Sequence, residues 1–309
     1  MLLDQKGQLW DVDEFEREDE LEQLVFENYQ LIYGDQSLLF GKKIISTMSG
    51  TRTIPDAYIV DLEERQWYLV EVELLHHGVY DHIVPQITKQ VNASSNPQMK
   101  SVLRQSFLTQ IQNNKEYLQL FKDAEIPEIQ IADVLDGILS KRPRVSIPID
   151  KADPELETWA QSLRYEVEIH EIVRYRNRET DAFMIQLPDI GSAPLIGGDQ
   201  ERSNNEHHAL MGKELLLKLV GSGFIQQGEK LWMKHKGKEF SATVTASGQL
   251  ELPDGTKHSP SLAAIRCTQS ISPNRKTSNG LRKWKNDKGE TLGEMRMRLF
   301  GKDDDSEAA

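Results

Sequence analysis

Hydrophobic residues recur first at helical spacing and then at strand spacing along the start of the chain. Between residues 12 and 33, Leu21, Val25 and Ile32 fall on one stripe and acidic residues fill the first turns, which predicts a first helix. Short apolar runs in SLLFGKKIIS and in residues 53–74, TIPDAYIVDLEERQWYLVEVEL, predict three strands. Helical spacing returns in VYDHIVPQITKQVNAS, so a second helix is predicted to begin near Asp81.

The pattern continues to alternate between helices and strands. MKSVLRQSFLTQIQNNKEYLQLF predicts a helix, RVSIPI a short strand, DPELETWAQSLR a helix, and YEVEIHEIVRYR with DAFMIQL a pair of strands. The early connections are too short for a doubly wound parallel sheet throughout. The fold class predicted for this half is therefore α/β (α+β), with a mixed sheet flanked by helices.

Charge divides the chain into two parts. Residues 1–190 contain 19 Lys and Arg against 34 Asp and Glu, or 19 − 34 = −15, whereas residues 207–302 give 17 − 8 = +9. The stretch 188–206 between them has Gly, Ser, Asn and Pro without apolar periodicity, which is typical of a linker. We therefore predict domains at 1–187 and 207–300, followed by an acidic tail at 301–309.

Composition excludes several classes of protein. The chain has no apolar run near the roughly 18 residues that span a bilayer, and its first residues lack the pattern of a secretory signal. A single cysteine, Cys267, excludes an internal disulfide and suits a reducing compartment. These features predict a cytoplasmic protein without a membrane partner.

Carboxylates occupy unexpected positions in the predicted hairpin of residues 53–74. A turn centred on residues 64–65 would make partner numbers sum to about 129, which sets Asp56 opposite Glu73 and Tyr58 opposite Glu71, all on one face. Like charges facing each other destabilise a sheet, unless they take up protons or bind a cation. Hard divalent ions with oxygen ligands suit such a cluster, and the alternative is a solvent-exposed polar sheet edge.

The element order and these carboxylates, over about residues 12–150, resemble the PD-(D/E)XK nuclease superfamily. The matching motifs are Pro55-Asp56 and Glu71-Val72-Glu73. The resemblance implies a Mg²⁺ or Mn²⁺ ion held by Asp56, Glu71 and the carbonyl of Val72, with Glu18 on the first helix assisting through water.

The motif departs from the usual pattern because Glu73 stands where the family has a lysine. Gln86 and Lys89 lie three residues apart on the second helix and can approach the cluster together. We therefore predict Lys89 as the displaced lysine, with an ordinary solvated lysine as the alternative. Glu73 is then either a third metal ligand or an indication that the lysine of the site lies on the second helix instead.

Histidines follow the motif at once, in ELLHHGVYDH. His76, His77 and His82 adjoin two glutamates, which permits a zinc site, but neighbouring residues at a strand end point apart. We favour the nuclease interpretation over a zinc site here.

The second half predicts a small α+β domain. A helix ends at Gly221 or Gly223, alternating strands with glycine turns follow, and SPSLAAIRCTQS predicts a helix with Ser259 as N-cap and Pro260 at its first position. The last segment adds strand-like pieces and a C-terminal helix or strand.

Three segments of this half, LVGSGFI, DGTKHSPSLAA and NGLRKW, resemble the RAMA domain, which is associated with restriction enzymes and adenine methylases. The resemblance implies a domain that reads DNA, including modified bases. Leu281 stands where family members often have an aromatic residue.

Basic and aromatic residues of this half are candidates for DNA contacts. For Trp232 and Trp284, core packing is favoured over base stacking. The predicted DNA-binding residues are Lys234, Lys236, Lys238, Ser259, Ser261, Arg282, Lys283 and Trp284.

Together these features predict a Mg²⁺- or Mn²⁺-dependent DNA endonuclease, acting in modification-dependent restriction or phage defence. One active site cuts one strand, so cleavage of a duplex favours a homodimer. The alternatives are a non-catalytic DNA-binding adaptor on a degenerate nuclease fold, and a structure-specific DNA repair nuclease.

Overall fold

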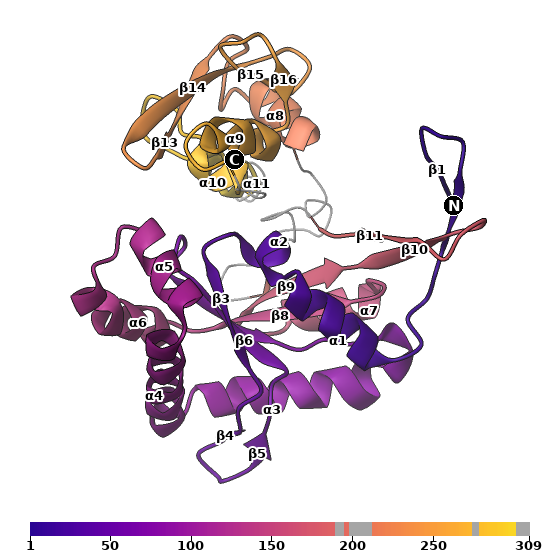
Figure 1. Cartoon of the computed structure of the whole chain (residues 1–309), viewed down its shortest axis with the longest axis vertical. Coiled ribbons are helices and arrows are strands. Elements are labelled where there is room, and N and C mark those ends of the chain that lie inside the picture. The colour runs from indigo at the N-terminus through magenta and orange to yellow at the C-terminus, as the bar shows by residue number, and fades with distance from the viewer. Residues whose placement is uncertain (189–194, 198–211, 274–277, 301–309) are drawn as a thin grey trace, which may run out of the picture. The chain divides into compact units, whose positions relative to one another are not determined.

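The computed structural model describes residues 1–188, 195–197, 212–273 and 278–300, which form two compact units (Figure 1). The first unit contains the described residues up to Gly197, and the second contains those from Gly212 onward. Both units combine helices with sheets, so the predicted α/β (α+β) class is confirmed.

A mixed six-stranded sheet forms the centre of the first unit, in the order β12-β9-β8-β7-β6-β3. β7, β8 and β9 are parallel, and the other neighbours are antiparallel. Its strands are β3 Ser37–Gly41, β6 Ala57–Asp61, β7 Gln66–Val70, β8 Arg144–Ile149, β9 Glu166–Glu171 and β12 Leu195–Gly197.

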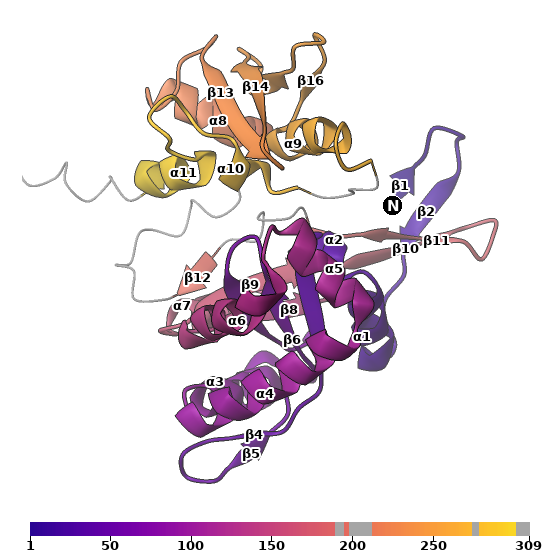
Figure 2. The ribbon, with the colours of Figure 1, turned by 60° about the vertical axis from the view of Figure 1, so that its left-hand side comes forward.

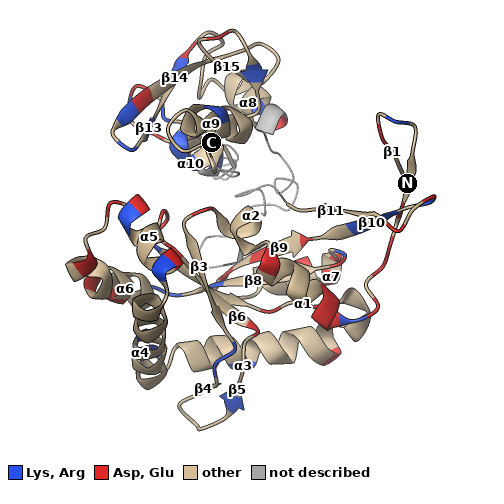
Figure 3. Cartoon of the chain, in the orientation of Figure 1, with Lys and Arg blue, Asp and Glu red and all other residues tan. Residues whose placement is uncertain are grey.

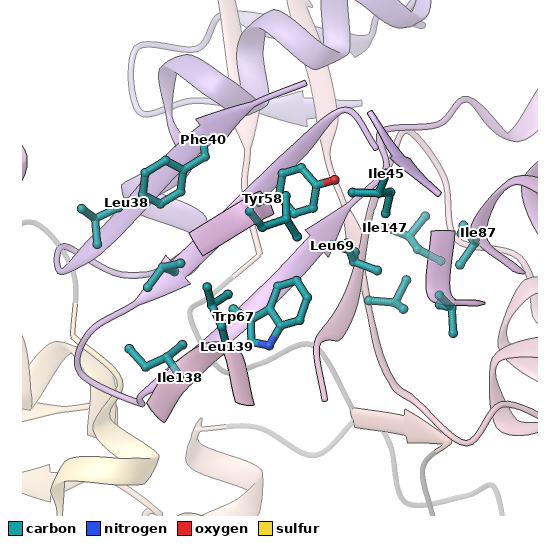
Figure 4. Packing of buried hydrophobic residues seen from close by; sticks show 14 of the residues in the cluster. Leu38, Phe40, Ile45, Tyr58, Trp67, Leu69, Ile87, Ile138, Leu139 and Ile147 are labelled. Carbon is teal, nitrogen blue, oxygen red and sulfur yellow. The ribbon is translucent and has the colours of Figure 1, made fainter. Parts of the chain in front are cut away.

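Helices cover both faces of this sheet, as Figure 2 shows from a second direction. Side chains alternate along each strand, so Tyr58 and Leu69 join one apolar core while Ile59 and Tyr68 join the other. Figure 4 shows the first of these cores. Its helices are α3 Val84–Ser94, α4 Pro97–Asn113, α5 Lys115–Asp123, α6 Ile131–Ser140 and α7 Pro154–Gln161, and the other core uses α1 Glu18–Glu27 and α2 Tyr29–Tyr33.

The first helix differs from its prediction at both ends. Helix α1 begins at Glu18, and Asn28 separates it from α2. The Asn28 side-chain amide donates to the Leu24 carbonyl at 2.9 Å, a local bond that competes with helix continuation. Residues before Glu18 include strand β2 Leu9–Val12, so the predicted span of 12–33 was too long.

The second helix begins near the predicted Asp81, but with an irregular turn. Val79–Ile83 form a π-helical turn, and the regular helix α3 starts at Val84 with Pro85 in its first turn. Helix α6 was not predicted from the sequence.

The predicted strand pair near residue 170 belongs to two sheets. Strand β9 ends at Glu171 and joins the six-stranded sheet, while β10 Val173–Asn177 pairs with β11 Phe183–Gln186 and with β2. This second sheet has the order β1-β2-β10-β11, with β1 at Leu2–Leu3, and β4 Ile45–Ser46 pairs separately with β5 Arg52–Thr53. The stretch predicted as a linker supplies β12, and most of its other residues lie outside the described ranges.

The hairpin that carries the carboxylates is two residues out of the predicted register. Asp61 pairs with Gln66, so partner numbers sum to 127 and residues 62–65 form the loop. The Asp61 carboxylate accepts hydrogen bonds from two loop N–H groups, at 2.8 and 3.3 Å. This aspartate turn stabilises a four-residue loop in place of a two-residue turn.

The observed register changes the partners of the carboxylates but not their face. Tyr58 pairs with Leu69, and the next pair in the same register is Asp56 with Glu71, instead of the predicted Asp56 with Glu73. A shift of two residues preserves the side-chain alternation, so the predicted common face is retained.

The second unit is a small α+β fold, as predicted. Its antiparallel sheet has the order β13-β14-β15-β16, and a tight turn at Lys236 and Gly237, both with positive φ, joins β13 to β14. Ser259 is the N-cap of α9 and Pro260 its first residue, which confirms both predictions. The elements are α8 Gly212–Gly221, β13 Lys230–His235, β14 Lys238–Val244, β15 Leu250–Glu251, β16 Lys257–His258, α9 Pro260–Gln269, α10 Gly280–Lys283 and α11 Leu292–Phe300.

No helix within the described residues is long and apolar enough to cross a membrane. The predicted acidic tail, residues 301–309, lies outside those residues.

Candidate functional site

Three charged side chains form a row across the end of strands β3, β6 and β7. β3 pairs Gly41 with Ala57, so the next positions, Lys42 and Asp56, are neighbours in the same register. The β6–β7 register then continues to Asp56 and Glu71. Lys42, Asp56 and Glu71 therefore come from three different strand ends and meet at one edge of the sheet.

Asp56 is buried and oriented by the strand beside it. Its carboxylate accepts a hydrogen bond from the backbone N–H of Val72 at 3.0 Å, and its own N–H donates to Glu71 at 3.3 Å. Asp56 therefore lies next to both Glu71 and the backbone of Val72.

Glu71 receives two amide donors from helix α3. Gln90 donates to one carboxylate oxygen at 2.5 Å, and Gln86 donates to the other. Gln86 and Gln90 are four residues apart and so share a face of the helix. The predicted contribution of Gln86 is seen, whereas Gln90 was missed.

Lys89 does not lie where the sequence suggested. It is exposed on α3, between the two glutamines that turn toward Glu71. Lys42 contacts the carboxylates instead, with its ammonium 3.1 Å from Asp56 and 2.8 Å from Glu22. Lys42, which was not predicted, is therefore a cation that contacts the motif, while the exposure of Lys89 fits the alternative of an ordinary solvated lysine. Lys42 is brought to Asp56 by the pairing of β3 with β6, and the local pattern of apolar and polar residues does not reveal that pairing.

Helix α1 adds two further carboxylates to the row. One oxygen each of Glu18, Glu22 and Asp56 lie within 4.8 Å of one another. Figure 3 shows acidic residues along α1 and basic residues in the segment leading to β4. Such a set of oxygen ligands fits a hard divalent cation. Glu18 was predicted to assist the metal through water, whereas Glu22 was not among the predicted site residues.

The carboxyl groups of Asp56 and Glu71 both have raised pKa values. Burial raises the pKa of Asp56 above its ordinary value, although the Val72 N–H and Lys42 oppose the shift. Burial and the charge of Asp56 raise the pKa of Glu71 well above its ordinary range. Although burial lowers the pKa of the Lys42 ammonium, its hydrogen bond to Glu22 and the charge of Asp56 raise that pKa overall. A bound cation would oppose both shifts, because its positive charge favours the ionised carboxylates.

Glu73 stands apart from this row. It is 1% exposed and bridges to Ile149 of β8 through its backbone, while its side chain lies near His77 and His82. Burial, Glu18 and Asp56 raise the pKa of Glu73 to about 8. His76, which the sequence grouped with the other two histidines, is exposed.

Three of the basic residues of the second unit lie around one hairpin. Lys234, Lys236 and Lys238 are exposed at the end of the β13–β14 pair. Trp232, on the same strand face as Lys234, is 38% exposed. These side chains are accessible to a polyanion, as predicted for the three lysines.

Trp284 contradicts its predicted place among the DNA-binding residues. It is fully buried in the core of the second unit, and its indole N–H donates to the carbonyl of Pro260 at 2.9 Å. A base cannot stack on it in this structure, and the favoured interpretation of core packing holds for this residue. Trp232 is 38% exposed, so the favoured interpretation of core packing is wrong for that residue.

The other predicted DNA contacts also have structural partners. The Ser259 hydroxyl accepts from the Leu262 N–H, and the Ser261 hydroxyl accepts from the Gly280 N–H, each at 3.4 Å. Arg282 and Lys283 are half-buried, and each takes part in an interaction.

The geometry defines a class: a mixed-sheet unit with a buried carboxylate row at one edge, joined to a small α+β unit with an exposed basic hairpin. Residues 199–305 match the family model described as RAMA, Restriction Enzyme Adenine Methylase Associated. This match confirms the predicted resemblance of the C-terminal part and associates it with restriction systems. No curated protein matches the chain.

Proposed function

We propose that the chain is a Mg²⁺- or Mn²⁺-dependent DNA endonuclease of modification-dependent restriction or phage defence. The N-terminal unit would cut DNA, and the C-terminal unit would recognise it. The observation that carries the proposal is the buried row of Asp56 and Glu71 beside Val72, with the Lys42 ammonium 3.1 Å from Asp56.

The topology supports this proposal. The order α1, β3, β6, β7, α3, β8 is the helix, three strands, helix, strand order expected for a PD-(D/E)XK core. Asp56 directly precedes β6 and Glu71 directly follows β7, which is where that motif would place its carboxylates.

The residues of this site suit hydrolysis of a phosphodiester. A divalent cation, when bound, lowers the pKa of a water molecule and neutralises charge on the phosphate. Asp56, Glu71 and the Val72 carbonyl would hold that cation, and Glu18 would orient water beside it. Lys42 would stabilise negative charge that develops on the phosphate oxygens. Gln86 and Gln90 donate to both oxygens of Glu71 and would favour its ionised, ligating form, against the burial that raises its pKa.

The second unit offers a surface for DNA. Lys234, Lys236 and Lys238 would contact phosphates, and Trp232 is exposed beside them for stacking. The net charge of −15 over residues 1–190 weakens binding of DNA by the first unit, so cutting would depend on the second.

The decisive experiment is digestion of matched phage DNAs, unmodified and carrying different base modifications, with Mg²⁺ or Mn²⁺. We expect the full chain to cut modified DNA, and Asp56→Asn and Glu71→Gln to abolish cutting. Glu157→Gln is the matched control, because Glu157 is an exposed glutamate on α7. Equal cutting in EDTA would contradict the metal requirement.

One observation favours a second candidate, a non-catalytic DNA-binding adaptor. Both Glu71 oxygens already accept amide donors, and Glu73 replaces the motif lysine. If DNA binds but neither metal supports cleavage of any substrate, the adaptor function replaces the nuclease.

Duplex cleavage would be coordinated by a homodimer, because one site cuts one strand. Analytical ultracentrifugation of the chain on cognate DNA tests this, and a monomer that makes only nicks would contradict it.

A further inference from the structure

The segment after the motif turns back on itself and brings two histidines to Glu73. Leu75–His77 form a 3₁₀ turn and Val79–Ile83 a π-helical turn before α3. π-helical turns are rare and occur often at functional sites. Here the turn sets His82 beside His77, with ring centroids 5.4 Å apart.

Four potential ligand atoms converge at this point. His77 Nδ1 lies 3.2 Å from Glu18 and 3.6 Å from Glu73, and His82 Nε2 lies 3.9 Å from the same Glu73 oxygen. The four atoms all fall within 4.8 Å of one another. Ligands bound to one ion at about 2.1 Å in a tetrahedron are roughly 3.4 Å apart. The observed separations are therefore close to those that one ion requires.

Glu73 is the group that most needs a partner. Its side chain is 1% exposed, and among the described residues neither carboxylate oxygen makes a hydrogen bond. A buried carboxylate without hydrogen bonds is destabilising, so natural proteins pair it or use it to bind a metal. The Nδ1 atom of His77, which is directed at Glu73 and Glu18, also makes no hydrogen bond within the described chain.

The identity of the ligands selects the class of metal. Two imidazole nitrogens with two carboxylates suit Zn²⁺ and other first-row transition metals. Mg²⁺ and Ca²⁺ prefer sites made of oxygen ligands. The row of Asp56, Glu71 and Val72, by contrast, offers oxygen alone.

We propose that Glu73, His77, His82 and Glu18 form a transition-metal site suited to Zn²⁺, next to the row of Asp56 and Glu71. Glu18 borders both, since its carboxylate also lies within 4.8 Å of Glu22 and Asp56. The inference does not depend on the proposed nuclease activity, because it concerns metal binding in the absence of DNA.

The test is Zn²⁺ binding to the full chain by calorimetry, with Co²⁺ as a spectroscopic substitute whose visible absorption reports its ligands. We expect wild type to bind Zn²⁺ far more tightly than Mg²⁺ at this site. His77→Ala and His82→Ala should each weaken Zn²⁺ binding by at least about 10–100-fold, the loss that even outer-shell changes produce. Both variants should also change the Co²⁺ spectrum.

His76→Ala is the matched control, since His76 adjoins His77 but lies outside the cluster. It should leave Zn²⁺ affinity unchanged. Asp56→Asn should leave the Co²⁺ spectrum unchanged, which separates this site from the carboxylate row. Circular dichroism checks that each variant is folded, and Glu73→Gln gives an additional, near-isosteric test. Wild-type Zn²⁺ affinity and Co²⁺ spectrum in folded His77→Ala and His82→Ala would overturn the proposal.

Discussion

The ammonium of Lys42 lies 3.1 Å from a carboxylate oxygen of Asp56, across the β3–β6 pair. The two residues are fourteen positions apart in the chain, and they meet because β3 and β6 run antiparallel in register. This contact places a cation beside a motif whose own lysine position holds Glu73.

Replacement of Lys42 tests its role in the proposed chemistry. We expect Lys42→Ala to lower the cleavage rate by about 10²–10³-fold, the loss found when one charge-stabilising donor is removed from an active site. Single-turnover cleavage with Mn²⁺ measures this. Lys89→Ala serves as the control, because Lys89 is exposed, and it should cleave at the wild-type rate. The reverse ranking of the two variants would restore Lys89 as the displaced lysine.

Removal of Gln90 should shift the pH dependence of metal binding. Gln90 donates to Glu71 and thereby lowers the pKa of that carboxyl, which burial raises. Gln90→Leu should raise the pKa further, so Mn²⁺ would bind only at higher pH. A hydrogen bond to a charged group contributes about 1.5–3 kcal/mol, or roughly one to two pH units. Mn²⁺ binding followed by electron paramagnetic resonance across pH measures the shift, and Gln105→Leu, at an exposed glutamine of α4, should show none.

Glu73 should make the metal-free protein less stable as the pH rises. Burial, Glu18 and Asp56 raise the pKa of Glu73 from 4.5 to about 8, so the folded state keeps a proton that the unfolded chain loses in this window. The free energy of unfolding therefore falls between about pH 4.5 and 8. Glu73→Gln should remove this part of the slope and raise Tm at pH 8 by a few degrees, since about 1 kcal/mol corresponds to roughly 2–4 °C.

Thermal unfolding in EDTA at several pH values compares the two proteins. Asp56 and Glu71 also have raised pKa values and act in the same direction, but they are present in both. Parallel Tm curves for wild type and Glu73→Gln would show that Glu73 is ionised without penalty.

The basic hairpin should determine the salt dependence of DNA binding. Replacing Lys234, Lys236 and Lys238 together by Gln leaves up to three phosphates without a neutralising ammonium. The slope of log K against log salt should therefore become shallower by about 0.9 for each phosphate that is no longer neutralised. Fluorescence anisotropy at several salt concentrations measures the slope. The charge-matched control replaces Lys115, Lys122 and Lys151, which are exposed in the first unit. An equal change of slope in that control would show that the hairpin is not the specific DNA-binding surface.

Gly280 should be intolerant of any side chain. A Cβ at this position would lie 2.2 Å from the backbone of Pro260, where α10 approaches the start of α9. Gly280→Ala should destabilise the second unit by about 1–3 kcal/mol or more, measured by chemical denaturation. Gly221→Ala is the control, because a Cβ there meets nothing within 4 Å and alanine favours the helix. Equal stability of both variants would refute the close packing.

In the NGLRKW segment, the residues that carry the family resemblance are not the ones accessible for binding DNA. Asn279 caps α10, Gly280 permits the close approach, and Trp284 fills the core and bonds to Pro260. The segment was correctly placed in a RAMA-like domain. Its residues hold the fold, whereas the exposed aromatic residue, Trp232, lies on a strand elsewhere.

Sequence alone determined which face of the hairpin carries the carboxylates. Side chains alternate with a period of two, so Asp56 and Glu71 share a face in the predicted register and in the observed one. The charge division between the halves could also be predicted, because it depends only on composition. The Ser259 cap could be predicted because it depends only on neighbouring residues.

Only the tertiary structure decided which partners each carboxylate has. Lys42 contacts Asp56 because β3 pairs with β6. His77 lies near Glu73 because of a 3₁₀ turn, which no periodic sequence pattern predicts. Register between strands and the path of an irregular turn depend on packing across the whole unit. The local pattern of apolar and polar residues therefore predicted where the acids lie. Their partners, which are Lys42, the glutamines of α3 and the histidines near Glu73, depend on long-range contacts.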